Sequence, residues 1–150
     1  MKGVTELGSI WASVGAAAVL ALGGRRRVAG PALAAAAVTW ALGQALKRVW
    51  KRPRPYDAFD GDGTSRLLIG KPRGASWPSS HPAVLTAFLT VAERELGPGP
   101  PSRIALVALA GAAGASRVVL GVHYPSDVAS GLLLGRAVGL LWPEERPTGR

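Results

Sequence analysis

VAGPALAAAAVTWALGQAL, residues 28–46, is a run without a single charged side chain. At about 1.5 Å per residue, a helix of this length crosses a hydrocarbon core of about 30 Å. Ala, Val and Leu dominate the run, and polar residues do not recur at a regular interval, which is typical of a helix that has lipid as its solvent. Residues 28–46 therefore predict a transmembrane helix.

Four other apolar segments accompany this helix, at residues 10–22, 82–92, 104–120 and 128–142. Two of them contain an arginine, Arg117 and Arg136, and an ionised side chain at the bilayer centre costs at least about 2.5 kcal/mol. Both arginines therefore need a partner or a function. The sequence predicts an all-α, multi-pass membrane bundle of about five helices, formed by a single domain over residues 1–150, with the polar stretch 47–80 as a long functional loop.

The last apolar segment carries Gly131, Gly135 and Gly139 at four-residue spacing. This spacing places three positions without side chains along one face of a helix, where another helix can approach closely. Packing inside the bundle is the favoured interpretation, and a homo-oligomer through the same three glycines is the alternative.

Composition narrows the range of functions. The chain has no Cys, which excludes disulfides and thiolate metal sites. Its 18 Lys and Arg against 9 Asp and Glu give a formal net charge of +9, which suits phosphate-bearing partners. Most aromatic residues are Trp at predicted helix ends, as at a membrane interface, and they do not interleave with the basic patches. The expected partners are therefore membrane lipids and a phosphorylated substrate, and not nucleic acid.

Three polar clusters lie where the predicted helices end. They are Lys47 with Arg54 and Pro55, then Pro78-Ser79-Ser80-His81, and finally Ser116-Arg117 with His123 and Asp127. The cations Lys47, Arg54 and Arg117 can converge on one tetrahedral dianion, because guanidinium forks match pairs of phosphate oxygens. The clusters therefore predict an anion site.

The only two histidines of the chain lie at predicted helix starts. Residues 78–82 indicate a start at which Ser79 or Ser80 caps the helix and the free backbone N–H groups point at an anion. His123 precedes a second start. Asp127, four residues later, can reach one imidazole nitrogen and fix the tautomer, which leaves the other nitrogen free to attack.

Each cluster also has a purely structural interpretation. The run Lys47, Arg48, Lys51 and Arg52, taken alone, is more often a topology signal or a contact with the lipid surface. A lone His before a turn is more often structural, and Ser-Ser-His can be a simple helix cap. The coincidence of both histidines, an acid four residues from one of them, and an arginine at a membrane helix end favours a catalytic site.

The sequence implies no metal and no cofactor. The acidic stretch of Asp57, Asp60 and Asp62 has Lys71 where position 12 of a calcium loop starting at Asp60 requires a bidentate Glu. No grouping of His and carboxylates has the spacing of a zinc site. The stretch is interpreted as a turn-rich lid.

In its three motifs the sequence resembles the type 2 phosphatidic acid phosphatase family, which shares its core with vanadium haloperoxidases. Lys47 with Arg54-Pro55 is similar to the first family motif. Residues 78–81 are similar to the second motif, and Ser116-Arg117 with His123 and Asp127 is similar to the third. The order and the internal spacing of the motifs are those of the family.

The resemblance implies a metal-independent hydrolysis of a lipid phosphate in a membrane, such as a polyprenyl phosphate derivative or a phosphatidic-acid-like lipid. The bias towards Ala, Gly and Arg, with only four Lys, indicates a bacterial genome of high GC content. His123 is the implied nucleophile, Asp127 orients it, and His81 acts first as acid and then as base. The implied phosphate ligands are Lys47, Arg54, Ser79, Arg117 and the backbone N–H of Ser80.

One residue departs from the family pattern, because Ser80 stands where the family commonly has Gly. A side chain there can crowd the phosphate or add a hydroxyl donor. Two other functions stay open: a non-catalytic protein that binds lipid phosphate or acts as a scaffold, and a vanadium-dependent haloperoxidase. Intact His81, His123 and Asp127 argue against the first, and the membrane spans disfavour the second.

Membrane orientation is predicted from the basic residues outside the clusters. Five spans place Arg25 to Arg27 and Arg94 to Arg103 on one side of the membrane and the three clusters on the other. Positive residues near helix ends favour the cytoplasm, whereas the cations of the clusters are accounted for by phosphate binding. The active site is therefore expected on the extracytoplasmic side of the cell membrane.

Overall fold

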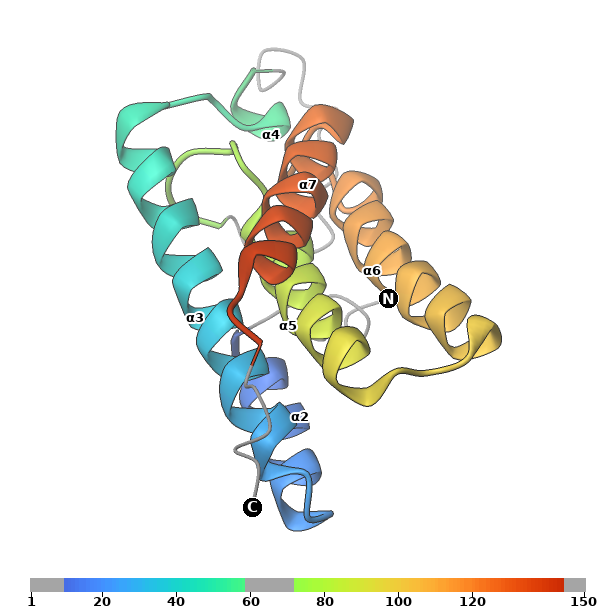
Figure 1. Cartoon of the computed structure of the whole chain (residues 1–150). Helices are drawn as coiled ribbons and strands as arrows, with labels where there is room; N and C mark the ends of the chain where they lie inside the picture. The colour runs from blue at the N-terminus through green and yellow to red at the C-terminus, as the bar shows by residue number, and fades with distance from the viewer. Residues whose placement is uncertain (1–9, 59–71, 145–150) are drawn as a thin grey trace.

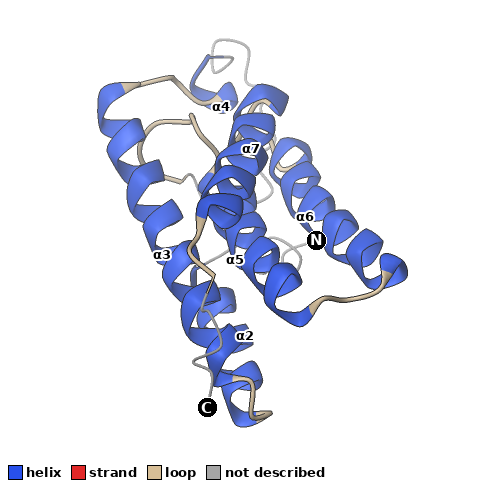
Figure 2. Ribbon diagram, viewed as in Figure 1, coloured by secondary structure: helices blue, strands red, loops and turns tan. Residues whose placement is uncertain are grey.

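The computed structural model describes residues 10–58 and 72–144, and the regular structure within these ranges is entirely helical (Figure 2). The helices are α2 (Ile10–Leu22), α3 (Arg26–Val49), the short α4 (Pro55–Ala58), α5 (Ser80–Leu96), α6 (Pro100–Val119) and α7 (Pro125–Leu141). The predicted all-α bundle of about five helices is confirmed, since α4 is only one turn within the loop. Asp60, Asp62 and Lys71 of the predicted lid lie outside the described residues.

Successive long helices run in opposite directions (Figure 1). The C-terminal ends of α3 and α6 and the N-terminal ends of α5 and α7 therefore meet at one end of the bundle, beside α4. At the opposite end, α2 packs along the first half of α3. This up-and-down arrangement brings all three sequence clusters to the same end of the molecule.

Two of the described helices are long and apolar enough to cross a membrane. They are α3 and α6, each with a mean hydropathy of 1.3 over its most apolar window. The third apolar helix, α2, is shorter. The run at residues 28–46 extends by one turn or less at either end to form α3, because helix-compatible polar residues flank it.

The core lies where α5 packs between α3 and α7. Small residues on α3 allow the larger side chains of α5 to approach closely, and the buried cluster includes Ala32, Ala35, Ala36, Val84, Phe88 and Val91. Close packing of this kind maximises dispersion contacts, which is how helices associate within lipid. As a result, α5 is a fixed central element, and its first turn reaches the end of the bundle where the clusters meet.

The glycine row of α7 faces α5. A Cβ atom at Gly131 or Gly135 would overlap the carbonyl oxygen of Ser79 or Ala83, and one at Gly139 would lie 2.5 Å from Cβ of Thr90. The row is therefore used for packing inside the bundle, the interpretation favoured from sequence. A second copy of the chain could not use the same row as a seam while α5 occupies it.

Polar partners account for Arg136 in the last apolar segment. Its Nη1 lies 3.1 Å from Oε2 of Glu93 and 3.4 Å from Oγ1 of Thr90, both on α5. Arg103 on α6 lies 3.5 Å from the other carboxylate oxygen of Glu93. The charge within the apolar segment is thus paired with an acid, as expected of an arginine in a membrane helix.

Candidate active site

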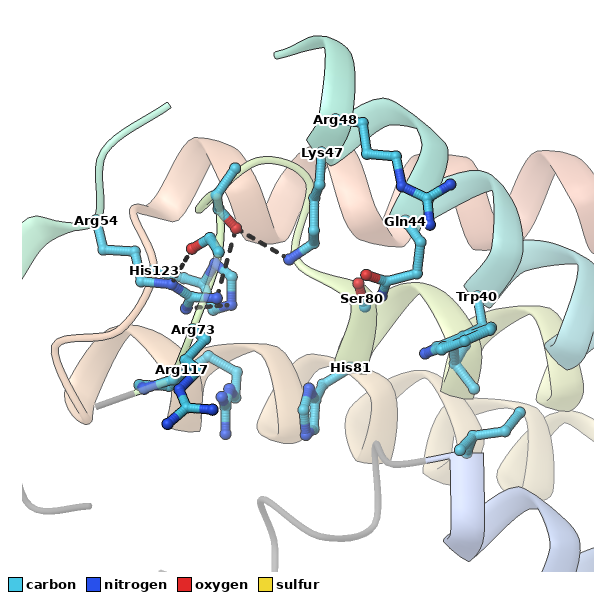
Figure 3. Close-up of a pocket in the computed structure, with 15 residues that line it drawn as sticks. Trp40, Gln44, Lys47, Arg48, Arg54, Arg73, Ser80, His81, Arg117 and His123 are labelled. Atoms are coloured by element: carbon cyan, nitrogen blue, oxygen red, sulfur yellow. Dashed lines mark hydrogen bonds between the residues drawn. The ribbon is translucent and has the colours of Figure 1, made fainter. Parts of the chain in front are cut away.

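The three clusters line one cavity of about 440 Å³ at the end of the bundle (Figure 3). Its walls include Lys47, Arg54, Ser80, His81, Arg117 and His123. Of the eight site residues predicted from sequence, these six line the cavity, whereas Asp127 and Ser79 do not. Cations from three separate parts of the chain therefore converge as the spacing of the clusters predicts.

Backbone carbonyls hold the first two cations in place. Lys47 Nζ donates to the carbonyl oxygen of Ala75 at 3.1 Å. Arg54 is only 4% exposed and donates from Nε to Gly74 O at 2.9 Å and from Nη1 to Val122 O at 3.0 Å. The segment around residues 72–76 thus fixes both cations at the cavity, so little ordering is left to be done when an anion binds.

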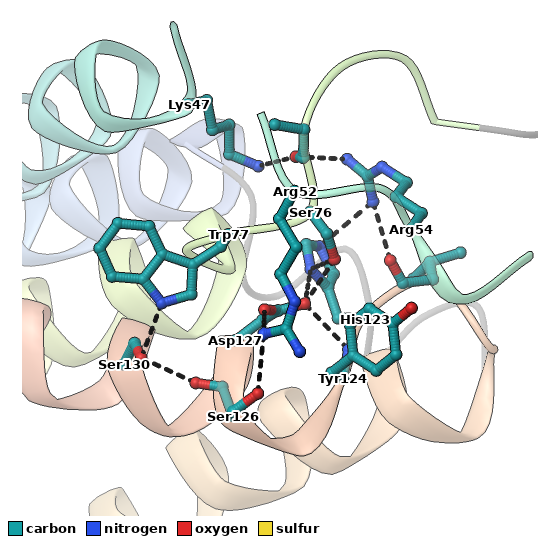
Figure 4. Close-up of polar contacts among 12 residues, drawn as sticks. Lys47, Arg52, Arg54, Ser76, Trp77, His123, Tyr124, Ser126, Asp127 and Ser130 are labelled. Atoms are coloured by element: carbon teal, nitrogen blue, oxygen red, sulfur yellow. Dashed lines mark hydrogen bonds and ion pairs between the residues drawn. The ribbon is translucent and has the colours of Figure 1, made fainter. Parts of the chain in front are cut away.

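His123 is 3% exposed, and its two ring nitrogens have different surroundings (Figure 4). Nδ1 lies 3.6 Å from Oδ2 of Asp127, slightly beyond hydrogen-bond distance. Ser76 stands beside both groups, because its Oγ donates to Asp127 Oδ2 and lies 3.5 Å from Nδ1. Nε2 lies 3.4 Å from Nη1 of Arg54, on the side of the cation cluster.

Asp127 is fully buried behind His123, in the first turn of α7. Its Oδ2 accepts the backbone N–H of Tyr124 at 2.9 Å, an interaction that also caps the helix. Its Oδ1 accepts Nη1 of Arg52 at 2.7 Å, and the guanidinium of Arg52 stacks 4.2 Å from the ring centre of Tyr124. A carboxylate held by this many donors is fixed in position.

Burial, and after it the neighbouring cations Arg54, Lys47 and Arg117, lower the pKa of His123 to about 2. Desolvation and like charge both disfavour the imidazolium form. His123 is therefore neutral at physiological pH and keeps a lone pair on one ring nitrogen, which is the state a nucleophile requires.

The first turn of α5 carries His81 into the cavity. Ser79 is the N-cap residue, as one sequence alternative has it, but its side chain makes no capping hydrogen bond. Ser79 is fully buried, and its backbone N–H donates to Asp127 O at 3.0 Å, which ties α5 to α7. The structure therefore places Ser79 behind the cavity wall and leaves the Ser80 side chain at the cavity.

Sequence reasoning missed three residues of the site. Ser76 and Arg52 contact Asp127, and Arg73 lines the cavity near Arg117 (Figure 3). In the sequence, Arg52 was noted only as the last residue of the basic run that begins at Lys47. Ser76 had no signal of its own, because its partner lies 51 residues away in the chain. Such contacts depend on how the loop folds back, which residue spacing does not encode.

Within residues 10–58 and 72–144, no three His, Asp or Glu side chains gather as a metal ion would require. The anion-binding capacity of the cavity comes instead from its Lys and Arg residues.

An all-helical bundle with membrane-spanning helices, and a buried neutral histidine that faces a cationic cavity, defines a membrane phosphatase of the histidine type. Residues 28–147 match the PAP2 superfamily. The chain belongs to this superfamily, and the family resemblance seen in the three motifs is confirmed.

Relatives and solved structures agree with this assignment. The decaprenylphosphoryl-5-phosphoribose phosphatase of Mycobacterium tuberculosis is 35% identical over 133 residues, which cover 87% of this chain and 68% of that protein. The crystal structure of Aquifex aeolicus LpxE matches with a TM-score of 0.81 at 25% identity, over 93% of this chain and 81% of that one. The first transmembrane PAP2 type phosphatidylglycerolphosphate phosphatase from Bacillus subtilis matches with a TM-score of 0.77 at 25% identity, over 94% and 72%.

Proposed function

We propose that this chain hydrolyses the phosphate monoester of a membrane lipid through a phosphohistidine on His123. The observation that carries the proposal is the arrangement around this residue. Its Nδ1 side faces Asp127 and Ser76, while Nε2 lies on the side of Arg54 and the cation cluster. One nitrogen is thus fixed by polar neighbours, and the other is available to phosphorus.

In the first step, the Nε2 lone pair of His123 attacks phosphorus and the bond to the lipid oxygen breaks. His81 gives its proton to that oxygen, and the lipid leaves as an alcohol. Lys47, Arg54 and Arg117 stabilise the charge on the equatorial oxygens. The bound dianion also favours the protonated form of His81, because it brings negative charge into a cluster of cations.

In the second step, a water molecule attacks the phosphohistidine and gives its proton to His81. The bond between phosphorus and Nε2 breaks, inorganic phosphate leaves, and His123 returns to its neutral form. Asp127 keeps the imidazole in the attacking tautomer throughout, and Ser76 and Arg52 keep Asp127 in place.

We propose a polyprenyl phosphate derivative as the substrate class. The relative from Mycobacterium tuberculosis is named for such a lipid. The cavity supports the same choice, because it continues from its cationic end to the apolar residues Ile10, Trp40 and Val84. The active site is proposed to face the extracytoplasmic side, since Arg25, Arg26 and Arg27 stand at the opposite end of the bundle, where positive-inside topology places the cytoplasm (Figure 1).

The test is phosphate release by the purified protein from a panel of lipid phosphates: farnesyl phosphate, phosphatidic acid and phosphatidylglycerol phosphate. We expect release from at least one lipid, and none from any of them by a His123→Ala variant. Binding of all three lipids without release by the wild type would instead support the non-catalytic lipid-binding alternative. Halide oxidation that depends on added vanadate would support the haloperoxidase alternative.

A further inference from the structure

Ser80 departs from the family pattern, and the position of its hydroxyl is unusual for a residue in the cavity wall. The residue lines the phosphate cavity, yet its Oγ is buried and has no hydrogen-bond partner among residues 10–58 and 72–144. Figure 3 shows the side chain of Ser80 directed towards α3 and that of His81 directed away from it. The hydroxyl is therefore withdrawn from the space that a bound phosphate would take.

A glycine of α3 makes room for this hydroxyl. Gly43 is buried, and a Cβ atom at this position would lie 3.3 Å from Oγ of Ser80. Within the described part of the chain, no other atom outside α3 would come within 4 Å of such a Cβ atom. Gly43 thus leaves a space in the surface of α3, and the Ser80 hydroxyl fills it.

The first turn of α5 has little room to move on its other side. A Cβ atom at Gly131 of α7 would overlap the carbonyl oxygen of Ser79, and Ser79 N–H donates to Asp127 O at 3.0 Å. The turn is thus held between a glycine of α3 and a glycine of α7. Because its backbone is fixed, a methyl group added at Gly43 would displace the Ser80 hydroxyl by rotation about the Cα–Cβ bond, and the open space beside Ser80 is the cavity.

From this arrangement we infer that Gly43 is a positioning residue of the phosphate site: it keeps the hydroxyl of Ser80 out of the volume that the phosphate of the substrate occupies. Ser80 can then stand where the family commonly has Gly without crowding the phosphate. The sequence leaves two roles open for this side chain, an obstacle and an added donor, and it takes neither while Gly43 is present. The inference rests on the proposed function for its substrate, and it adds the coupled pair of Gly43 and Ser80 to the site.

A double-mutant cycle tests the pair. Gly43→Ala is made in the wild type and in a Ser80→Ala background, which keeps Cβ and lacks Oγ. Gly30→Ala is the matched control, because Gly30 lies on the same helix, is exposed, and a Cβ atom there meets nothing within 4 Å. Hydrolysis of farnesyl phosphate in neutral detergent gives KM and kcat, calorimetry gives the Kd of orthovanadate as a phosphate mimic, and thermal unfolding shows whether each variant is folded.

We expect Gly43→Ala to raise KM for farnesyl phosphate and Kd for orthovanadate about tenfold, as an extra methyl group in a packed site does. The value of kcat should change little, because His123 and Asp127 stay in place. In the Ser80→Ala background, the same substitution at Gly43 should change KM and Kd by less than about twofold, since the atom that the methyl group displaces is absent. Gly30→Ala should behave like the wild type in every measurement.

Three results would overturn the inference. Equal effects of Gly43→Ala in both backgrounds, or no effect in either, would show that Gly43 and Ser80 are not coupled. Tighter binding of orthovanadate by Gly43→Ala would show that the displaced hydroxyl is a ligand and not an obstacle. A Gly43→Ala protein that does not fold would show that α5 moves instead of the hydroxyl.

The two readouts separate this inference from the proposed function. If the wild type hydrolyses no lipid phosphate but orthovanadate binding shows the expected pattern, the proposed function fails and the role of Gly43 stands. If lipid phosphates are hydrolysed and neither KM nor Kd responds to Gly43→Ala, the role of Gly43 fails and the proposed function stands.

Discussion

At the scale of single residues, the two histidines have different neighbours. His123 is almost fully buried and has Asp127 and Ser76 beside its Nδ1. His81 lies in the first turn of α5, and within the described ranges it makes no ion pair with an acid. A histidine with an orienting acid suits nucleophilic attack, while one at the cavity without such a partner suits proton transfer. Substitution of His123 and substitution of His81 should therefore block different steps of the reaction.

We predict that His123→Ala forms no phosphoenzyme with any substrate, because His123 is the histidine that has Asp127 as its orienting acid. His81→Ala should lose turnover of lipid substrates but still react with an activated aryl phosphate, whose phenolate departs without a proton. Since water activation is also lost, this variant should accumulate an acid-labile, base-stable phosphohistidine, detectable with labelled phosphate. Label trapped by His123→Ala and not by His81→Ala would reverse the two roles.

Ser76 gives the second prediction at this scale, because its hydroxyl joins the nucleophile to its acid. Ser76→Ala should lower kcat about fivefold with KM nearly unchanged, since a net hydrogen bond is worth roughly 1 kcal/mol and the phosphate ligands stay in place. Ser76→Thr, which keeps the hydroxyl, should recover most of the rate. Ser130→Ala is the matched control, because Ser130 bonds Trp77 and not Asp127. Equal losses in Ser76→Ala and Ser130→Ala would mean that the loop is merely loosened.

At the scale of helices, the contact between α5 and α7 is the most demanding in the bundle. A Cβ atom at position 135 would overlap the carbonyl of Ala83, whereas one at Gly111 on α6 meets nothing within 4 Å. Gly135→Ala should therefore destabilise the protein by about 1 to 3 kcal/mol, and Gly111→Ala should be neutral or slightly stabilising. Thermal unfolding in detergent measures both. A stable Gly135→Ala protein would show that α7 can shift away from α5 at little cost.

The helices also show how far the sequence alone could lead. Uncharged runs and motif spacing predicted the all-α bundle and the meeting of Lys47, His81 and His123. Helix ends were less accurate: α5 was predicted over residues 82–92 and spans Ser80–Leu96, because Glu93 and Arg94 form tertiary pairs that let the helix continue through charged residues. The positions of Ser76 and Arg52 follow from loop folding and had no counterpart in the local sequence.

At the scale of the whole molecule, membrane orientation can be tested cleanly because the chain has no Cys. Ala58 lies at the active-site end and Ser102 at the opposite end, and both are exposed. With an extracytoplasmic site, an impermeant thiol reagent applied to intact cells should label Ala58→Cys at once and Ser102→Cys only after lysis. The opposite labelling pattern would place the active site in the cytoplasm.

Metal independence is a further prediction for the whole enzyme. Its charge stabilisation is proposed to come from Lys47, Arg54 and Arg117, so excess chelator should leave the rate of phosphate release unchanged. Vanadate should inhibit competitively, because it occupies the phosphate site. Activity that disappears in chelator and returns with magnesium would contradict the mechanism.

The position of Asp127 at the start of α7 has a consequence for the order in which the enzyme is made. During synthesis, Lys47 on α3 and His81 on α5 enter the membrane first. His123 and Asp127 follow only with the hairpin formed by α6 and α7. The row of glycines on α7 then closes against α5, and Ser79 N–H bonds Asp127 O across the two helices. With His123 and Asp127 in their proposed roles, a nascent chain is expected to be inactive until its last helix has inserted, so that an incompletely assembled copy does not consume lipid phosphates.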